Sequence, residues 1–262
     1  MKMNPYYQTL WVVWGNHLLT ITAMLFFFEW WMIPIAFASG HLFSIFSEIG
    51  IHRYFTHRAF KVESRWKEHL MKVFAFLTGQ GAILSWVTVH RHHHLYEDKP
   101  GDPHSPMLYP WWKIYVGLFP KTYTKNLVTD LIRHPDRRYF VFENNYYWLL
   151  WTALWVVSFA IHPVLFFVIT SGSAVWYAFT SIVNIFLHSR IIGHVDHPDH
   201  VASNSGWLNW FTGVGYHNNH HKLPSSYTYN LDGKDRDWIG AIIKYVIADK
   251  LTVEAKNESS IS

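Results

Sequence analysis

Four long apolar stretches, separated by polar segments of very different length, dominate the pattern of this 262-residue chain. They cover residues 9–28, 33–51, 146–161 and 164–187, and Glu48 is the only formally charged residue within them. Apolar stretches of about 17–25 residues are long enough to cross a bilayer as helices. The links at 29–32 and 162–163 are so short that the four spans must pair into two helical hairpins. We therefore predict an all-α integral membrane protein with four transmembrane helices.

The polar remainder, about 52–145 and 188–262, is predicted to form a helical cap on one side of the membrane, so that 1–262 is a single domain. Within it the pattern reads as helical around Trp66 to Val89, followed by a loop from Lys99 to His104. All 22 Lys and Arg lie outside the four spans, and none falls in either hairpin link. The positive-inside rule then places both termini and the cap in the cytoplasm.

The composition agrees with a membrane protein and narrows the chemistry. Only 15% of the residues are charged, well below the roughly 25% of soluble proteins, and 19% are aromatic. The chain has no cysteine, which excludes disulfides, thiolate metal sites and a built-in iron–sulfur cluster. The net charge of +4 is not gathered into a run of Lys and Arg, so a membrane surface is a better partner than nucleic acid.

Nine of the 19 histidines follow a spacing that suits metal ligands. They lie at the predicted cytoplasmic ends of spans or in the cap, and residues three or four apart share one face of a helix. The set consists of His52-X4-His57, His90-X2-His93-His94, His217-X2-His220-His221 and His188, which follows Asn184 by four residues. Nine imidazoles exceed the four to six positions of one ion, so the pattern predicts two metal ions. Imidazole suits both iron and zinc, and the spacing does not choose between them.

His52 and His57 are five residues apart, or about 140° around a regular α-helix. Both can face one site only if the helix ends between them. Glu48, one turn before His52, is either a carboxylate that orients this imidazole or an interfacial charge that reaches water. Trp86, one turn before His90, either lines a substrate tunnel or fills the core of the cap.

The other histidines are expected to have no part in the metal site. His194, His197 and His200 are separated by Asp196, Pro198 and Asp199, which favours a solvated loop. Three further histidines are predicted at the surface and two inside spans, where they bond locally or face the bundle interior. These are His69, His92 and His134, and His17 and His41 respectively.

The histidine boxes resemble those of the membrane fatty-acyl desaturases, with the greatest similarity to the stearoyl-CoA and bacterial Δ9 acyl desaturase branch. The similarity runs from the first span to about Tyr229. It includes His52-Arg53, Trp86, Asp102-Pro103-His104 and the run from Gly215 to His221. The resemblance implies two Fe ions held by the nine histidines, with Asn184 contributing through water. Zinc can replace iron in a purified sample of such a site.

The resemblance also implies the reaction: O2-dependent insertion of a first, Δ9-type cis double bond into a saturated fatty-acyl chain held in a bent tunnel. The third box begins with His217, where front-end desaturases have Gln. An external electron donor such as ferredoxin or cytochrome b5 is expected, because the chain has neither Cys nor a His-Pro-Gly-Gly haem signature.

The sequence departs from the family pattern at two places, and two other functions are weighed against desaturation. Val214 stands where the family often has Glu, so a carboxylate must come from elsewhere, and bulky residues after Asn184 leave the length of the substrate open. A membrane hydroxylase with the same metal plan would make an alcohol instead of an alkene. A membrane metal carrier would need polar ligands throughout the bilayer depth, whereas these histidines gather on one side.

Overall fold

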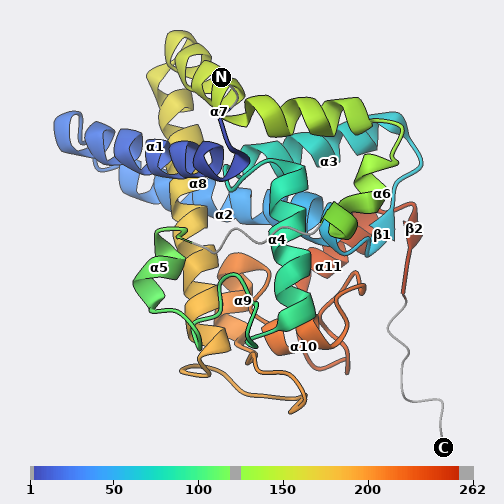
Figure 1. Ribbon diagram of the computed structural model, residues 1–262. Coiled ribbons are helices and arrows are strands. Elements are labelled where there is room, and N and C mark those ends of the chain that lie inside the picture. The colour runs from blue at the N-terminus through green and yellow to red at the C-terminus, as the bar shows by residue number, and fades with distance from the viewer. Residues whose placement is uncertain (1–2, 119–124, 254–262) are drawn as a thin grey trace, which may run out of the picture.

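The computed structural model describes residues 3–118 and 125–253, and within them the protein is almost entirely helical, as predicted (Figure 1). Residues 119–124 and 254–262 of the predicted cap lie outside the described residues. The first half contains α1 (Pro5–Phe26), α2 (Met32–Phe46), η1 (Ser47–Thr56), β1 (Phe60–Lys61), α3 (Arg65–Leu77), α4 (Ile83–Tyr96) and α5 (Trp111–Tyr115). The second half contains η2 (Lys125–Val128), α6 (Thr129–Ile132), α7 (Arg137–Ile161), α8 (Pro163–Ile182), η3 (Val183–Leu187), α9 (Gly206–Thr212), α10 (His217–Lys222), α11 (Trp238–Ile242), η4 (Ile243–Ile247) and β2 (Lys250–Leu251).

Three of the predicted spans correspond to helices that are long and apolar enough to cross a membrane: Pro5–Phe26, Met32–Thr56 and Pro163–Leu187. The third predicted span, 146–161, is the second part of α7, which kinks at Tyr146 (φ −126°, ψ 15°). From the kink onward the helix has only 16 residues, 146–161, and Glu143, Asn144 and Asn145 precede them. The helix therefore lacks a window of the required length and hydropathy, and the fourth crossing stays a prediction.

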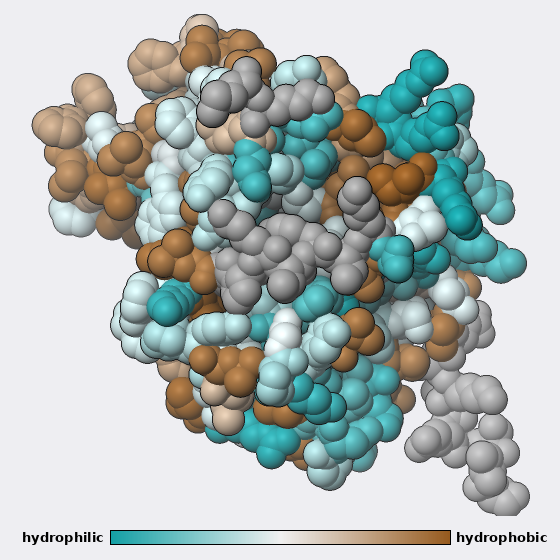
Figure 2. All heavy atoms as spheres, in the orientation of Figure 1, coloured by the Kyte–Doolittle hydropathy of each residue, from teal (hydrophilic) through white to brown (hydrophobic). Residues whose placement is uncertain are grey.

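Helices α1, α2, α7 and α8 pack through small and polar residues. A Cβ on Gly40 of α2 would lie only 2.4 Å from Val175 Cγ1, so this glycine lets α2 and α8 approach closely. Asn16 of α1 donates to Ser173 Oγ on α8 (2.9 Å) and accepts from the indole N–H of Trp155 on α7 (2.8 Å). The buried amide thus connects three helices. Figure 2 shows that the far ends of α1 and of the α7–α8 hairpin form a predominantly hydrophobic surface.

The predicted helix around Trp66 to Val89 is wrong in one respect, because the chain breaks between α3 and α4. Gly79 (φ +71°) and Gly81 (φ +129°) take backbone conformations that other residues rarely adopt. A side chain at Gly79 would also meet Ser173 Oγ at 2.0 Å. The break turns α4 so that its three site histidines face the ends of η1 and η3. A core of residues from η1, α3, α4 and α11, including Ile49, Met71, Ile83 and Ile239, supports this arrangement.

The all-α expectation has one small exception. Strands β1 and β2 form a two-stranded antiparallel sheet in which Phe60 pairs with Leu251 and Lys61 with Lys250. The pairing joins two segments of the cap that are almost 200 residues apart in the sequence. The sheet lies at the right-hand side of the molecule in Figure 1, and β1 also contacts η1.

Candidate metal centre

The structure brings all nine predicted histidines together, from the ends of η1 and η3 and from α4 and α10. They form two adjacent sets, in each of which one ring nitrogen per residue lies within 4.8 Å of all the others. The five-histidine group is His52, His57, His90, His94 and His220, and the four-histidine group is His93, His188, His217 and His221. The two groups touch where the rings of His94 and His221 stack, with centroids 4.4 Å apart.

Helices α4 and α10 each contribute to both groups. On α4, His90 and His94 belong to the five-histidine group and His93 to the four-histidine group. On α10, His220 belongs to the first group and His217 and His221 to the second. Because each of these helices presents rings to both groups, its rigid backbone fixes the separation between the groups.

The segment carrying His52 and His57 departs from the prediction that the helix ends between them. It continues as a π-helix, and the N–H of His57 donates to the carbonyl of His52, five residues earlier (3.1 Å). Since a π-helix pairs residue i with i+5, this winding turns both rings to one side, and their centroids are 4.9 Å apart. A second π-helical turn, η3, lies immediately before His188 and contains Asn184.

Carboxylates hold the outer nitrogens of three rings. Nδ1 of His52 donates to Glu48 (2.8 Å), that of His93 to Asp102 (2.8 Å), and that of His188 to Asp98 (2.7 Å). An ionised carboxylate only accepts hydrogen bonds, so each of these rings must carry its proton on Nδ1 and direct the lone pair of Nε2 into its group. A fourth carboxylate, Glu97, lies 3.4 Å from Nδ1 of His221 without a hydrogen bond.

Of these four carboxylates, only Glu48 was singled out for this position by sequence reasoning. Glu97 and Asp98 follow His93 and His94 by four residues, a spacing that would have suggested them. With Val214 in the place of a family carboxylate, the four acidic side chains come from η1 and from the segment after α4.

The electrostatics of the site favour neutral imidazoles beside charged carboxylates. Burial, and then the neighbouring rings, lower the pKa values of His57, His90, His94, His217, His220 and His221 well below 6.5. Burial alone would raise the pKa values of Asp98 and Asp102, but the hydrogen bonds from His188 and His93 hold both below 3.8. Neutral rings keep their lone pairs at pH 7, which is the form that binds metals.

The inward-facing nitrogens have the surroundings of metal ligands. Nε2 of His52 lies 3.0 Å from that of His90 and 3.2 Å from that of His220, with no acidic side chain between them. In the second group, Nε2 of His93 is buried without any hydrogen-bond partner. With its proton on Nδ1, His52 presents only a lone pair at Nε2, and inward-facing lone pairs on neighbouring rings repel each other unless a proton or a cation lies between them. A cation in each group would satisfy them, and the residues therefore fit two metal ions.

A cavity reaches this centre between α1, α4, α5 and α8, and its lining contains Trp86, His90, His104, Val183 and Asn184. The indole of Trp86 stacks on the ring of His90, with centroids 4.7 Å apart, and its N–H donates to Gln80 (3.3 Å). Trp86 therefore both lines the cavity and contacts a histidine of the five-histidine group.

Sequence reasoning missed His104, whose ring lies 4.3 Å from that of His93 and which faces the same cavity. Burial, and then the proximity of His93, lower the pKa of His104 to about 3.

A buried cation also supports the centre. Arg53 is fully buried, donates to Asp237 (2.7 Å), lies 3.4 Å from Glu48 and sits 3.7 Å from the ring centre of Tyr229. The hydroxyl of Tyr229 donates to Glu48 (3.2 Å), which in turn accepts from His52. These contacts fix the position of the Glu48 carboxylate. In the sequence, only the motif His52-Arg53 pointed to them.

Most of the remaining histidines lie as expected, with two exceptions, His41 and His92. His194, His197 and His200 lie in a loop, His69 is exposed and His134 is partly exposed. Inside the predicted spans, His17 bonds locally, donating to the carbonyl of Val13 (2.8 Å), whereas His41 bonds outside the four-helix bundle, donating to the carbonyl of Phe211 in α9 (3.0 Å). The surface prediction for His92 is wrong: its ring is buried, bonds the carbonyl of Gly101 (3.0 Å) and stacks on Tyr96, because the segment after α4 folds back over it.

The Fatty acid desaturase family model matches residues 8–237 of this chain. The chain belongs to the fatty acid desaturase family. It is 30% identical, over 94% of its length, to the sn-1 stearoyl-lipid 9-desaturase of Synechocystis and covers 78% of that protein. It is 31% identical to the chloroplastic palmitoyl-monogalactosyldiacylglycerol delta-7 desaturase of Arabidopsis thaliana, over 94% of this chain and 67% of the other. A hex-5-enoyl-[acyl-carrier protein] acetylenase of Moorena producens is 29% identical, over 81% of this chain and 74% of its own. The protein is thus an oxidoreductase, which disfavours the metal-carrier alternative.

Proposed function

We propose that this desaturase inserts a first, Δ9-type cis double bond into a saturated fatty-acyl chain, using O2, two iron ions and electrons from an external donor. The observation that carries the proposal is the convergence of nine histidines into two touching groups at the inner end of a cavity between apolar helices. The desaturases of Synechocystis and Arabidopsis named above support the reaction class.

Iron suits the five-histidine group better than zinc does. Structural and catalytic zinc sites in proteins are almost always four-coordinate and tetrahedral, whereas this group presents five imidazoles. The residues that would hold the two ions are the nine histidines, and we expect Asn184, which lines the same cavity, to contribute through water. When bound, an iron pair would supply O2 activation: with two electrons from the donor and two protons, O2 would take the two hydrogens of an unactivated methylene pair and leave as two molecules of water, which no side chain can bring about.

The chain's own residues position the substrate and keep the centre dry. The cavity wall carries Val13 and Leu10 of α1, Ile114 of α5 and Val183, which would hold methylene groups. Trp86 and the hydrogen bond from Gln80 to Thr180 (2.9 Å) form the wall beside the histidines. Since the position of the double bond depends on which methylenes lie against the centre, the length of chain that this wall admits sets the regiochemistry.

The carboxylates act on the ligands instead of the substrate. Glu48, Asp102 and Asp98 hold the Nδ1 protons of three rings, and this orients the Nε2 lone pairs and raises their basicity. We place the centre at the cytoplasmic membrane boundary, with both termini in the cytoplasm, because all 22 cationic residues lie outside the predicted spans. An acidic ferredoxin or cytochrome b5 suits the resulting basic face as electron donor.

Expression in a host that lacks its own desaturase tests the proposal. Mass spectrometry of fatty-acid methyl esters, with derivatisation to locate the double bond, should show new cis-Δ9 monoenes. The monoenes should disappear with His93→Ala and with His220→Ala but persist with His69→Ala, which removes an exposed imidazole outside both groups. Hydroxylated fatty acids without monoenes would favour the hydroxylase alternative and overturn the proposal.

A further inference from the structure

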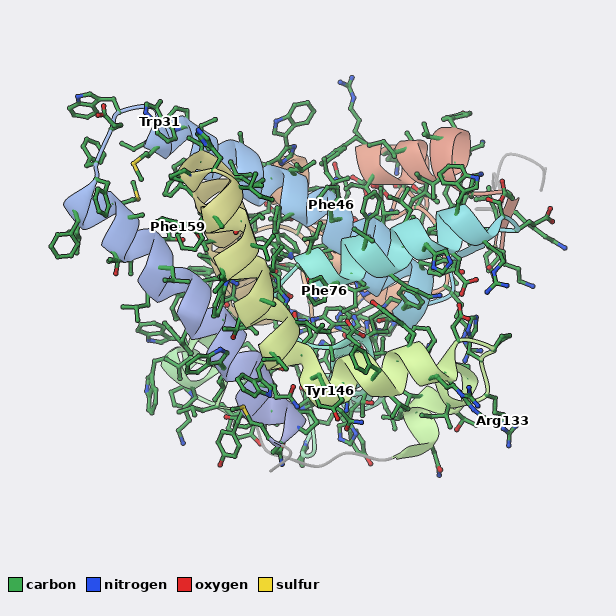
Figure 3. The ribbon with its side chains drawn as sticks, turned by 90° about the horizontal axis from the view of Figure 1, so that it is seen from above. Trp31, Phe46, Phe76, Arg133, Tyr146 and Phe159 are labelled. Atoms are coloured by element: carbon green, nitrogen blue, oxygen red, sulfur yellow. The ribbon has the colours of Figure 1, made fainter. Side chains whose placement is uncertain are left out.

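Two short apolar helices of the predicted cap, α9 and the continuous α11–η4, descend along α2 instead of lying above it. The carbonyl of Phe211, at the end of α9, accepts hydrogen bonds from His41 Nδ1 (3.0 Å) and Ser44 Oγ (3.3 Å). The ring of Trp238, at the start of α11, stacks on that of His41 with centroids 5.2 Å apart. Figure 3 shows the pale red C-terminal helix beside α2, near Phe46.

These contacts give the depth of both helices. His41 and Ser44 belong to the long apolar helix Met32–Thr56, 11 and 8 residues before the site residue His52. At 1.5 Å per residue they lie roughly 12–16 Å below His52 along this helix. Both also fall inside the predicted span 33–51. The parts of α9 and α11 that bond to them therefore lie at the level of the membrane, although the sequence pattern assigned 188–262 to the cytosolic cap.

The outward side chains of these helices are large, apolar and uncovered. Trp207, Trp210 and Phe211 of α9 are 60%, 67% and 49% exposed, and Tyr245 and Val246 of η4 are 77% and 67% exposed. Lys244 is the only charged residue in the two helices. Its ammonium lies 5.3 Å from the ring centre of Tyr245, and its long stem can carry the charge to the headgroups.

Length and composition then identify what covers this surface. The apolar helix Trp238–Ile247 is too short to span a bilayer, and Trp and Tyr favour the membrane interface. The surface is also continuous with a membrane-facing one, because α9 packs against α2 and α8, and α2 exposes Phe37 (58%) and Leu42 (42%). An isolated protein docking face would have no reason to continue the lipid-facing surface of a span.

We propose that α9 and α11–η4 form an interfacial platform, with Trp207, Trp210, Phe211, Tyr245 and Val246 inserted among the lipids of the cytoplasmic leaflet. The inference rests on the membrane placement in the proposed function and goes beyond it. The platform holds the metal centre at a fixed height above the leaflet, so an acyl chain can reach the centre without its lipid leaving the membrane. The cap is then partly immersed and not wholly cytosolic.

The absence of cysteine from the chain permits a clean test by single-site labelling. Trp210→Cys and Val246→Cys, each carrying a nitroxide spin label, would be reconstituted as full-length protein in phosphatidylcholine–phosphatidylglycerol vesicles. Ile191→Cys is the matched control, since Ile191 is also apolar and 63% exposed but lies in the loop after η3, beyond the metal centre. Power-saturation spectroscopy compares the accessibility of each label to O2, which concentrates in lipid, and to a water-soluble nickel chelate.

The expected result is that the labels at 210 and 246 are relaxed mainly by O2 and the label at 191 mainly by the chelate. Labels at 210 and 246 that are relaxed mainly by the chelate would overturn the platform. Protection from both reagents would also overturn it, because a second copy of the chain would then cover this face. Monoene formation by the same vesicles is measured in parallel. Its loss in unlabelled protein counts against the proposed function alone, whereas water-exposed labels in active vesicles count against the platform alone.

Discussion

The five-histidine group and the four-histidine group differ in the number of imidazoles and of carboxylates that they offer to a metal ion. The first gathers more rings, and only His52 among them bonds to a carboxylate, Glu48. The second has fewer rings, but Asp102 and Asp98 bond two of them and Glu97 approaches a third. A metal dication buried in protein needs donors and also compensating charge. The comparison indicates that one group relies on the number of neutral donors and the other on nearby negative charge.

Substitutions in α10, which carries histidines of both groups, are expected to have the largest effect and to distinguish the two groups. His220→Ala leaves four imidazoles in the five-histidine group and His217→Ala leaves three in the other, so each variant should bind the metal of its own group more weakly and lose about one metal ion per chain to a chelator before the other. Either change should abolish monoene formation. Metal analysis of purified protein checks the stoichiometry, with His69→Ala as the control that keeps both ions. Loss of both ions together in either variant would contradict the division into two groups.

Loss of single carboxylates should have the next largest effect. Glu48→Gln keeps an acceptor for His52 but removes the only bonded negative charge of the five-histidine group, so we expect its metal affinity to fall by about 10–100-fold. Asp102→Asn should weaken the four-histidine group less, because Asp98 still bonds His188. Competition with a chromophoric chelator measures both affinities. An equal loss in the two variants would show that bonded carboxylates do not distinguish the groups.

The stability of the metal-free protein should respond to pH in two separate windows. Four rings of the five-histidine group have pKa values lowered well below 6.5, against two in the other group. The unfolded chain takes up protons near pH 6.5 and the folded chain does not, so the free energy of unfolding should fall as the pH drops from 7.5 to about 5.5. Chemical unfolding in detergent at a series of pH values measures this loss.

The second window comes from Asp98 and Asp102, the carboxylates that bond rings of the four-histidine group. The pKa values of Asp98 and Asp102 are lowered from 3.8, so their contribution to stability is present above pH 3.8 and is lost as the pH falls through their folded values. Asp102→Asn should reduce the loss below pH 3.8 and leave the loss near pH 6.5 unchanged. A variant that removed the loss near pH 6.5 as well would contradict the assignment of the two windows to histidines and carboxylates.

The smallest effect is expected at Glu97. Its carboxylate lies 3.4 Å from His221 Nδ1 without a hydrogen bond and instead accepts from His200 Nδ1 (2.7 Å). Glu97→Gln should therefore change the affinity of the four-histidine group by less than about 10-fold, below the range for bonded carboxylates. The same chelator competition tests it, and a loss as large as that of Asp102→Asn would show that the longer contact matters equally.

The spacing of the histidines in the sequence was sufficient to predict which imidazoles converge. It did not predict the backbone conformations that bring them together. His90, His93 and His94 share one side of a regular helix, so their convergence follows from their positions in the sequence. The placement of His52 and His57 depends on a π-helix, which spacing on a regular α-helix does not predict. The break between α3 and α4 had a local signal in Gly79 and Gly81, whose permissive backbones interrupt the apolar pattern.

Long-range contacts account for the other differences. Asp102 and Asp98 reach His93 and His188 only because the segment after α4 folds back, which also buries His92. The depth of α9 and α11 depends on bonds from His41 and Ser44, about 170 residues earlier in the chain, and hydropathy alone assigned both helices to the cytosolic cap. Sequence reasoning therefore identified the histidines that converge but not the carboxylates that bond them or the exposed apolar surface nearby.

Iron K-edge X-ray absorption on the purified, monoene-forming protein, combined with its iron content, tests the central claim most directly. The expected result is two irons per chain, each coordinated mainly by imidazole nitrogens. Full activity with one iron per chain, or a first shell dominated by carboxylate oxygens, would contradict it.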